Sequence, residues 1–103
     1  LKLDNNSIGD AGCADLARAF ISGAWAKLKF LDLNGNEIGN SGCQCLADAL
    51  FQGAHADPGW LTKLERIFLR SNPIGEAGRT AFAKATAAAA AAAPDRKTVS
   101  VEW

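Results

Sequence analysis

One segment of the chain has the spacing of a calcium-binding loop. Asp32, Asn34 and Asn36 carry side-chain oxygens at alternate positions, as the first half of an EF-hand loop does. The second half of that pattern is missing. Glu37 stands where the loop needs its tight-turn glycine, and Cys43 stands where it needs a bidentate glutamate. The sequence therefore predicts no metal site here.

The glycines of the same segment resemble a dinucleotide-binding turn only in part. Gly35, Gly39 and Gly42 follow an apolar run and precede a helical pattern, but their spacing is not G-x-G-x-x-G. Similar glycines recur elsewhere in the chain, which indicates that they serve a repeated structural unit. We therefore expect no cofactor.

Catalysis would need a nucleophile or base held by neighbouring groups, and we find no such set. His55 is the only histidine and lies in a segment rich in glycine and proline, where we expect a solvated loop residue. Cys13 and Cys43 occupy equivalent places 30 residues apart, and an odd total of three cysteines gives no disulfide framework. We expect buried free thiols, no enzymatic activity and a reducing, cytoplasmic location.

These residues belong to a pattern that occurs three times. Each copy starts with alternating apolar residues, continues with an asparagine and an isoleucine–glycine pair, and ends in a glycine: residues 1–12, 31–42 and 67–78. Steps of 30 and 36 residues indicate a solenoid, in which each unit packs only against its neighbours. We expect one domain over 1–103, with repeats of about 1–27, 28–63 and 64–95 and a closing strand at 98–103.

The first half of each unit has the pattern of a strand and a turn. The alternation of apolar residues predicts a short strand with one buried face. The asparagine that follows can satisfy backbone groups where the strand turns away, so we expect a ladder between units: Asn6, Asn36 and Asn72. The glycine after each isoleucine predicts a positive φ or a close approach: Gly9, Gly39 and Gly75.

The second half of each unit has the pattern of an amphipathic helix. Apolar residues recur at i, i+3, i+4 and i+7 from Cys13, and again from Cys43. Asp10 and Asn40 are placed to cap the helices of their own units, and Gly53 is placed to end the second helix.

The third unit has the features of a terminal one. Arg79 stands where the earlier helices have cysteine, so we expect no further full helix packed on that side. A valine pair follows Ile67 and Leu69 at a distance of 32 residues, which predicts a closing strand in that register. Trp103 is then expected to cover the end of the core.

These motifs resemble the leucine-rich repeat family, and within it the ribonuclease-inhibitor-like subfamily. The helix halves read GCADLARAF from Gly12 and GCQCLADAL from Gly42, close to that subfamily's glycine, small residue, leucine–alanine and final apolar residue. The resemblance implies an α/β horseshoe fragment with parallel strands on the concave side and helices on the convex side. It also implies the contexts of NOD-like receptors, ribonuclease-inhibitor-like binders and Ran GTPase-activating proteins.

The concave face is the expected binding surface, because residues between the inward leucines point the other way. In register they form two rows: Lys2, Asp32, Phe68 and Ser100, then Asp4, Asn34, Arg70 and Glu102. The candidate partner-binding set is Lys2, Asp4, Phe30, Asp32, Asn34, Arg66, Phe68 and Arg70. An aromatic side chain on the outer face of a sheet is a candidate anchor, which singles out Phe30 and Phe68.

The balance of acidic and basic residues excludes some classes of partner. The chain carries 11 basic and 11 acidic residues and a formal net charge of +0, which disfavours nucleic acid and membrane surfaces. We expect recognition of another protein, and an open strand edge at the amino-terminal repeat that permits self-association. Two alternatives stay open: part of a Ran-type GTPase-activating protein, or a purely structural repeat segment.

Overall fold

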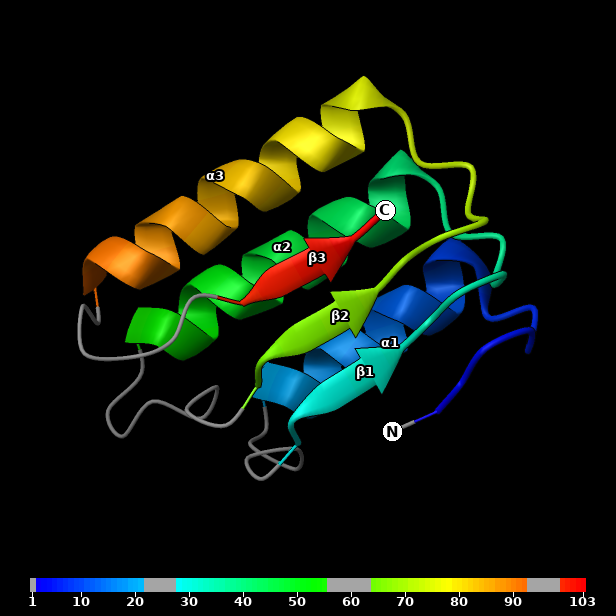
Figure 1. The fold of residues 1–103 in the computed structure, drawn as a ribbon, viewed down its shortest axis with the longest axis horizontal. Helices are drawn as coiled ribbons and strands as arrows, with labels where there is room; N and C mark the ends of the chain where they lie inside the picture. The colour runs from blue at the N-terminus through cyan, green and yellow to red at the C-terminus, as the bar shows by residue number, and fades with distance from the viewer. Residues whose placement is uncertain (1, 22–27, 56–63, 93–98) are drawn as a thin grey trace.

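The computed structural model describes residues 2–21, 28–55, 64–92 and 99–103. The elements in chain order are α1 (Gly9–Ile21), β1 (Phe30–Asp32), α2 (Asn40–His55), β2 (Arg66–Phe68), α3 (Glu76–Ala92) and β3 (Ser100–Glu102). The strands form one parallel sheet in the order β1-β2-β3, and the helices lie side by side on one face of it (Figure 1). The predicted α/β class with parallel strands is confirmed.

The chain consists of successive strand–turn–helix units, and we call residues 2–21 the first unit, 28–55 the second and 64–92 the third. The strand segment of the first unit joins the sheet through a parallel bridge between Lys2 and Asp32. The amide of Leu3 donates to the carbonyl of Asp32 at 2.9 Å, and the amide of Leu33 donates to that of Phe68 at 2.8 Å. The amide of Leu69 donates in the same way to the carbonyl of Glu102 at 2.7 Å, so the three leucines occupy equivalent positions on adjacent strands of the sheet.

The core lies between the sheet and the helices. The strands contribute their inward leucines and isoleucines, and the helices contribute buried apolar side chains that include Cys13, Ala17, Cys43, Leu46, Ala47, Leu50, Phe82 and Ala85. The largest fully buried side chains include Phe82, Leu31, Leu33, Ile38, Leu46, Ile67 and Leu69. Burying one such side chain stabilises a fold by about 1.5–3 kcal/mol. The units are therefore held together mainly by apolar packing that is shared between neighbours.

The closing strand forms, but its predicted register is wrong by two residues. We expected the first valine of this segment to lie opposite Ile67, but Val101 lies there. Glu102 therefore takes the place opposite Phe68 that the sequence pattern assigned to Ser100.

Trp103 gives a physical reason for this register. Its ring packs edge-on against Phe82, with 5.6 Å between ring centroids and 86° between ring planes. The guanidinium carbon of Arg79 lies 5.5 Å from the centroid of the same ring. Side chains alternate along a strand, so a shift of two residues keeps both valines facing inward. The indole has far more apolar area than a valine, and its packing over the core selects one of the two registers.

Two further sequence predictions about the helices are wrong. Helix α2 continues past Gly53 to His55, so the glycine does not end it and His55 belongs to the helix rather than to a loop. Asp10 and Asn40 do not cap their own helices. They lie within the first turns of α1 and α2, where side chains lean back toward the amino end of the helix.

Both side chains instead cap the helix of the following unit. Asp10 Oδ1 accepts hydrogen bonds from the amides of Gly39 and Gly42 at 2.7 and 2.9 Å. Asn40 Oδ1 does the same for the third unit, at 2.8 and 3.0 Å from Gly75 and Gly78. Each of these caps therefore links two units, which a cap within one unit would not do.

The glycines permit this close packing. A Cβ atom on Gly42 would lie 2.6 Å from Asp10 Oδ1 and 3.1 Å from the Cβ of Cys13. Glycine is therefore required where the start of one helix meets the side of the previous one. The sequence pattern also allowed a positive φ at the glycine after each isoleucine, and Gly9 has one, at +66°.

Candidate functional site

The candidate residues lie on the face of the sheet that is opposite to the helices. Burial alternates along β1 and β2 as exposed, buried and intermediate, so the first and third residues of each strand point away from the core. We call this surface the open face, and define it by the residues Lys2, Asp4, Phe30, Asp32, Asn34, Arg66, Phe68, Arg70 and Glu102.

The sheet register arranges the open face in rows across the strands. The central row contains Lys2, Asp32, Phe68 and Glu102, which are linked by the bridge and by the two strand pairings. An outer row pairs Phe30 with Arg66 and Arg66 with Ser100. Phe30 is 48% exposed. The central row differs from the predicted one only at Glu102, which replaces Ser100.

A shallow depression of about 340 Å³ lies over the central row, and it is lined by Asp32, Asn34, Phe68, Arg70 and Glu102. The sequence pattern placed Glu102 on the outer face of the sheet in the row of Arg70 but left it out of the candidate partner-binding set, and the structure places it in the central row opposite Phe68. The signal that could have corrected the predicted register of the closing strand was Trp103, because a large ring directly after the strand favours a position over the core.

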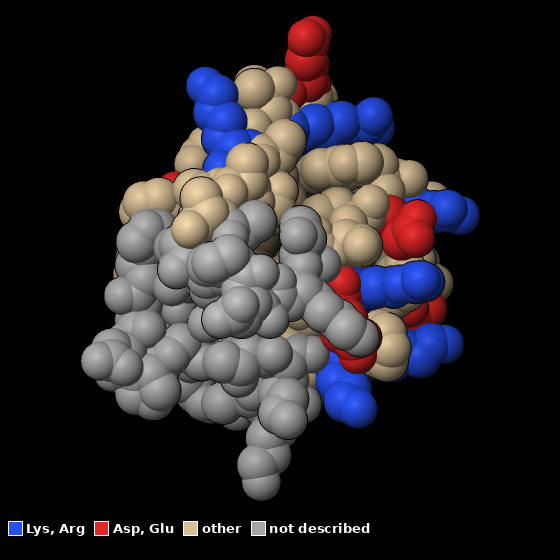
Figure 2. All heavy atoms as spheres, turned by 60° about the vertical axis from the view of Figure 1, so that its left-hand side comes forward, with Lys and Arg blue, Asp and Glu red and all other residues tan. Residues whose placement is uncertain are grey.

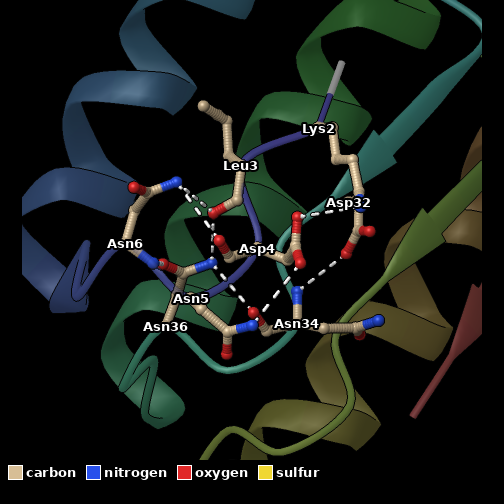
Figure 3. Close-up of polar contacts among 8 residues, drawn as sticks. All are labelled: Lys2, Leu3, Asp4, Asn5, Asn6, Asp32, Asn34 and Asn36. Atoms are coloured by element: carbon tan, nitrogen blue, oxygen red, sulfur yellow. Dashed lines mark hydrogen bonds and ion pairs between the residues drawn. The ribbon is translucent and has the colours of Figure 1, made fainter.

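The charges around the depression are partly paired. The ammonium of Lys2 lies 3.8 Å from a carboxylate oxygen of Asp4 (Figure 3), and the guanidinium of Arg70 lies 3.5 Å from Glu102. The basic side chains of both pairs are largely exposed to solvent, and ion pairs at the surface contribute little to stability. In the view of Figure 2, the acidic and basic side chains of the described residues are interspersed and form no broad region of one sign. The open face is therefore suited to a surface of mixed charge.

The asparagines behind the open face tie the units together (Figure 3). Asn36 is completely buried, and its Oδ1 accepts the amide hydrogen of Asn6 at 2.7 Å while its Nδ2 donates to the carbonyl of Leu3 at 2.8 Å. Asn72 repeats the arrangement, because its Oδ1 accepts from the amide of Asn36 at 2.8 Å. Only Asn36 is fully buried, since Asn6 is exposed and Asn72 is half-buried.

A second set of side-chain bonds positions the rim of the depression. Asn34 Oδ1 accepts from the amide of Arg70 at 2.7 Å, and Asp32 Oδ1 accepts from the amide of Asn34 at 3.1 Å. Polar side chains of the open face thus hold the backbone of the adjacent turns. The face is preorganised by bonds that do not depend on any ligand.

The two buried thiols, Cys13 and Cys43, are poorly suited to nucleophilic chemistry. Cys13 and Cys43 are buried and free, and burial raises their pKa values from the ordinary 9.0 to about 12 and about 11 respectively. A thiol with a raised pKa carries little nucleophilic thiolate near neutral pH. Among the described residues no three histidine, cysteine or acidic side chains gather in a way that could hold a metal ion. Across the same segments, no helix has the length and apolar character that crossing a membrane requires.

Comparison with known proteins is consistent with this geometry. Residues 26–47 match a family model described as Leucine Rich repeat, a segment that contains β1, the buried Asn36 and the first half of α2. The match supports a leucine-rich repeat protein, and domains of that class generally mediate protein–protein interaction. The search of curated proteins gave no match.

Proposed function

We propose that this chain is a protein-recognition module that binds its partner through the open face of the sheet. The observation that carries the proposal is the depression over the central row, where the ring of Phe68 lies between Asp32, Arg70 and Glu102. An aromatic side chain surrounded by polar groups has the character of an interface anchor with a polar rim. The class of protein that the family match supports is in keeping with this role.

Binding would proceed by covering the ring of Phe68 and exchanging water around the polar rim for partner groups. The carboxylates of Asp32 and Glu102 accept hydrogen bonds, and the guanidinium of Arg70 donates them. Because Asn34 already holds the backbone of Arg70, docking of a partner orders the side chain of Arg70 without also having to order its backbone. The partner we infer is a folded protein surface or an extended segment that carries both signs of charge.

We further propose that the units belong to a ribonuclease-inhibitor-like solenoid, with the open face on its concave side. The steps of 30 and 36 residues support this, as does the placement of the helices on one face of the sheet. The buried free thiols support a reducing, cytoplasmic location. In this proposal the chain binds and performs no catalysis of its own.

Affinity capture with matched variants tests the proposal. Phe68→Ala and Arg70→Ala alter the open face, whereas Lys84→Ala alters an exposed position on α3 and serves as the control. We expect a bound protein to be retained by the parent chain and the control, and its affinity to fall about tenfold or more with Phe68→Ala. Equal capture by all variants would contradict the assignment to the open face. Stimulation of GTP hydrolysis by a captured GTPase would support the Ran-type alternative instead.

A further inference from the structure

Phe68 has a carboxylate residue on each side of it in the central row of the open face. The register of the sheet places Asp32 on β1 and Glu102 on β3 directly opposite Phe68 on β2. All three residues are half-buried, and all three line the depression of about 340 Å³. A partner group that enters the depression over Phe68 therefore meets a negative charge on both sides.

Both carboxylates keep hydrogen-bonding capacity for a partner. Among the described residues, the side chain of Asp32 accepts one hydrogen bond, from the amide of Asn34 at 3.1 Å, and takes part in no ion pair. The side chain of Glu102 contacts the guanidinium of Arg70 at 3.5 Å, which is long for a charge-assisted hydrogen bond. Because an ionised carboxylate has about four lone-pair sites, each of the two can accept further hydrogen bonds.

The basic side chains nearest to the depression do not fill the place over the ring. Arg70 follows Phe68 by two residues, so it lies on the same face of the sheet but outside the central row. Lys2 belongs to the central row, but its ammonium is paired with Asp4 at 3.8 Å. The central row therefore has two acidic groups beside the ring, and Arg70 compensates only one of them.

The ring itself favours a partner group of positive charge. The face of an aromatic ring carries negative charge density and attracts a cation that lies over it. An acidic partner group would be repelled by Asp32 and Glu102, and an apolar group would desolvate both carboxylates without replacing their hydrogen bonds to water. A cationic group meets complementary charge from the ring and from both neighbouring strands.

We infer that the depression receives an arginine side chain of the partner, with its guanidinium over Phe68 and between Asp32 and Glu102. Adjacent strands lie about 4.7–4.9 Å apart, so the two carboxylates come from strands that are about 9–10 Å apart. A planar guanidinium with five N–H donors can stack on the ring and donate toward both strands, whereas a lysine ammonium is a compact point charge. The inference rests on the proposed function, because it names the group that the open face recognises.

Selection from a random peptide library displayed on phage tests the inference with the intact chain. Peptides are selected on the parent chain and sorted by whether Phe68→Ala abolishes their binding. Phe68→Leu, which keeps an apolar side chain without a ring, serves the same purpose if the alanine variant does not fold. We expect the peptides that depend on Phe68 to share an arginine. Replacing that arginine by citrulline, its uncharged isostere, should weaken binding about tenfold or more.

Matched variants of the chain locate the arginine. Asp32→Asn and Glu102→Gln remove the charges but keep an oxygen that can accept the hydrogen bonds from Asn34 and Arg70. In the double variant, the weakening caused by citrulline should fall to about twofold or less, because the charges to which arginine couples are absent. Glu76→Gln makes the same kind of change at an exposed position of α3 and should leave the weakening caused by citrulline as it is in the parent chain.

The outcomes separate this inference from the proposed function. Peptides that depend on Phe68 but share another residue in place of arginine would overturn the inference and leave the proposed function intact. An arginine whose replacement by citrulline costs as much in the double variant as in the parent chain would do the same. A selection that yields no peptide dependent on Phe68 would contradict the proposed function and the inference together.

Discussion

The carboxylate of Asp10 accepts a hydrogen bond from the amide of Gly39 at 2.7 Å, across the boundary between the first and second units. The same oxygen accepts from Gly42 at 2.9 Å, so one side chain satisfies two amides at the start of α2. A side chain that would ordinarily stabilise its own helix stabilises the next one, and this couples the folding of adjacent units.

We predict that Asp10→Ala lowers the free energy of unfolding by about 1–2 kcal/mol, because it removes a helix cap and leaves two amides without that acceptor. Asp10→Asn should retain most of the stability, since Asn40 performs the same function in the third unit. Urea unfolding followed by circular dichroism measures both. A loss as large for asparagine as for alanine would contradict the cap.

The buried Asn36 is expected to be the most sensitive rung of the ladder. Asn36→Ala removes the acceptor for the amide of Asn6 and the donor to the carbonyl of Leu3, so we predict a loss of about 2–4 kcal/mol. Asn6→Ala is the matched control. Asn6 is exposed, so its loss should be about 1 kcal/mol or less. Equal losses for the two variants would show that burial does not set the strength of the ladder.

Leu33 tests the shared apolar core. The side chain is 0% exposed, and Leu33→Ala should destabilise the chain by about 2–5 kcal/mol. Ile21 lies at the end of α1 and is 44% exposed, so Ile21→Ala should change the stability by about 0.5 kcal/mol or less. Thermal and urea denaturation report both values. A small effect of Leu33→Ala would mean that the units do not share one core.

Stability should fall at alkaline pH because of the buried thiols. Burial raises the pKa of Cys13 to about 12 and that of Cys43 to about 11, from an ordinary value of 9.0 that the unfolded chain retains. Above pH 9 the unfolded chain releases these protons while the folded chain keeps them. Between pH 9 and the raised pKa of each folded thiol, the free energy of unfolding therefore decreases by about 1.4 kcal/mol per pH unit for that thiol. Below pH 9 the contribution of the thiols to the free energy of unfolding is constant.

The double variant Cys13→Ala/Cys43→Ala isolates the contribution of the two buried thiols. Its unfolding free energy should decline less steeply between pH 9 and pH 11 than that of the parent chain. Identical slopes would indicate that the thiols ionise as readily in the folded chain as in the unfolded one.

Much of the local structure was predictable from residue patterns. Alternating leucines predicted the short strands, and the periodicity from Cys13 and Cys43 predicted the helices, because both patterns follow from the geometry of a single element. The repeated asparagine indicated bonds between units for the same reason, since its place after each strand is set by the repeat. The class of protein also followed from these motifs, and the family match over residues 26–47 supports it.

What only the tertiary structure decided concerns contacts between units. Strand alternation has a period of two residues, so it could not distinguish the observed pairing of Ile67 with Val101 from a register shifted by two, and the packing of Trp103 on Phe82 resolved it. That register in turn placed Glu102 beside Phe68 on the open face. The acceptor role of Asp10 was equally hidden, because a local pattern cannot tell which of two nearby helix starts a side chain will reach.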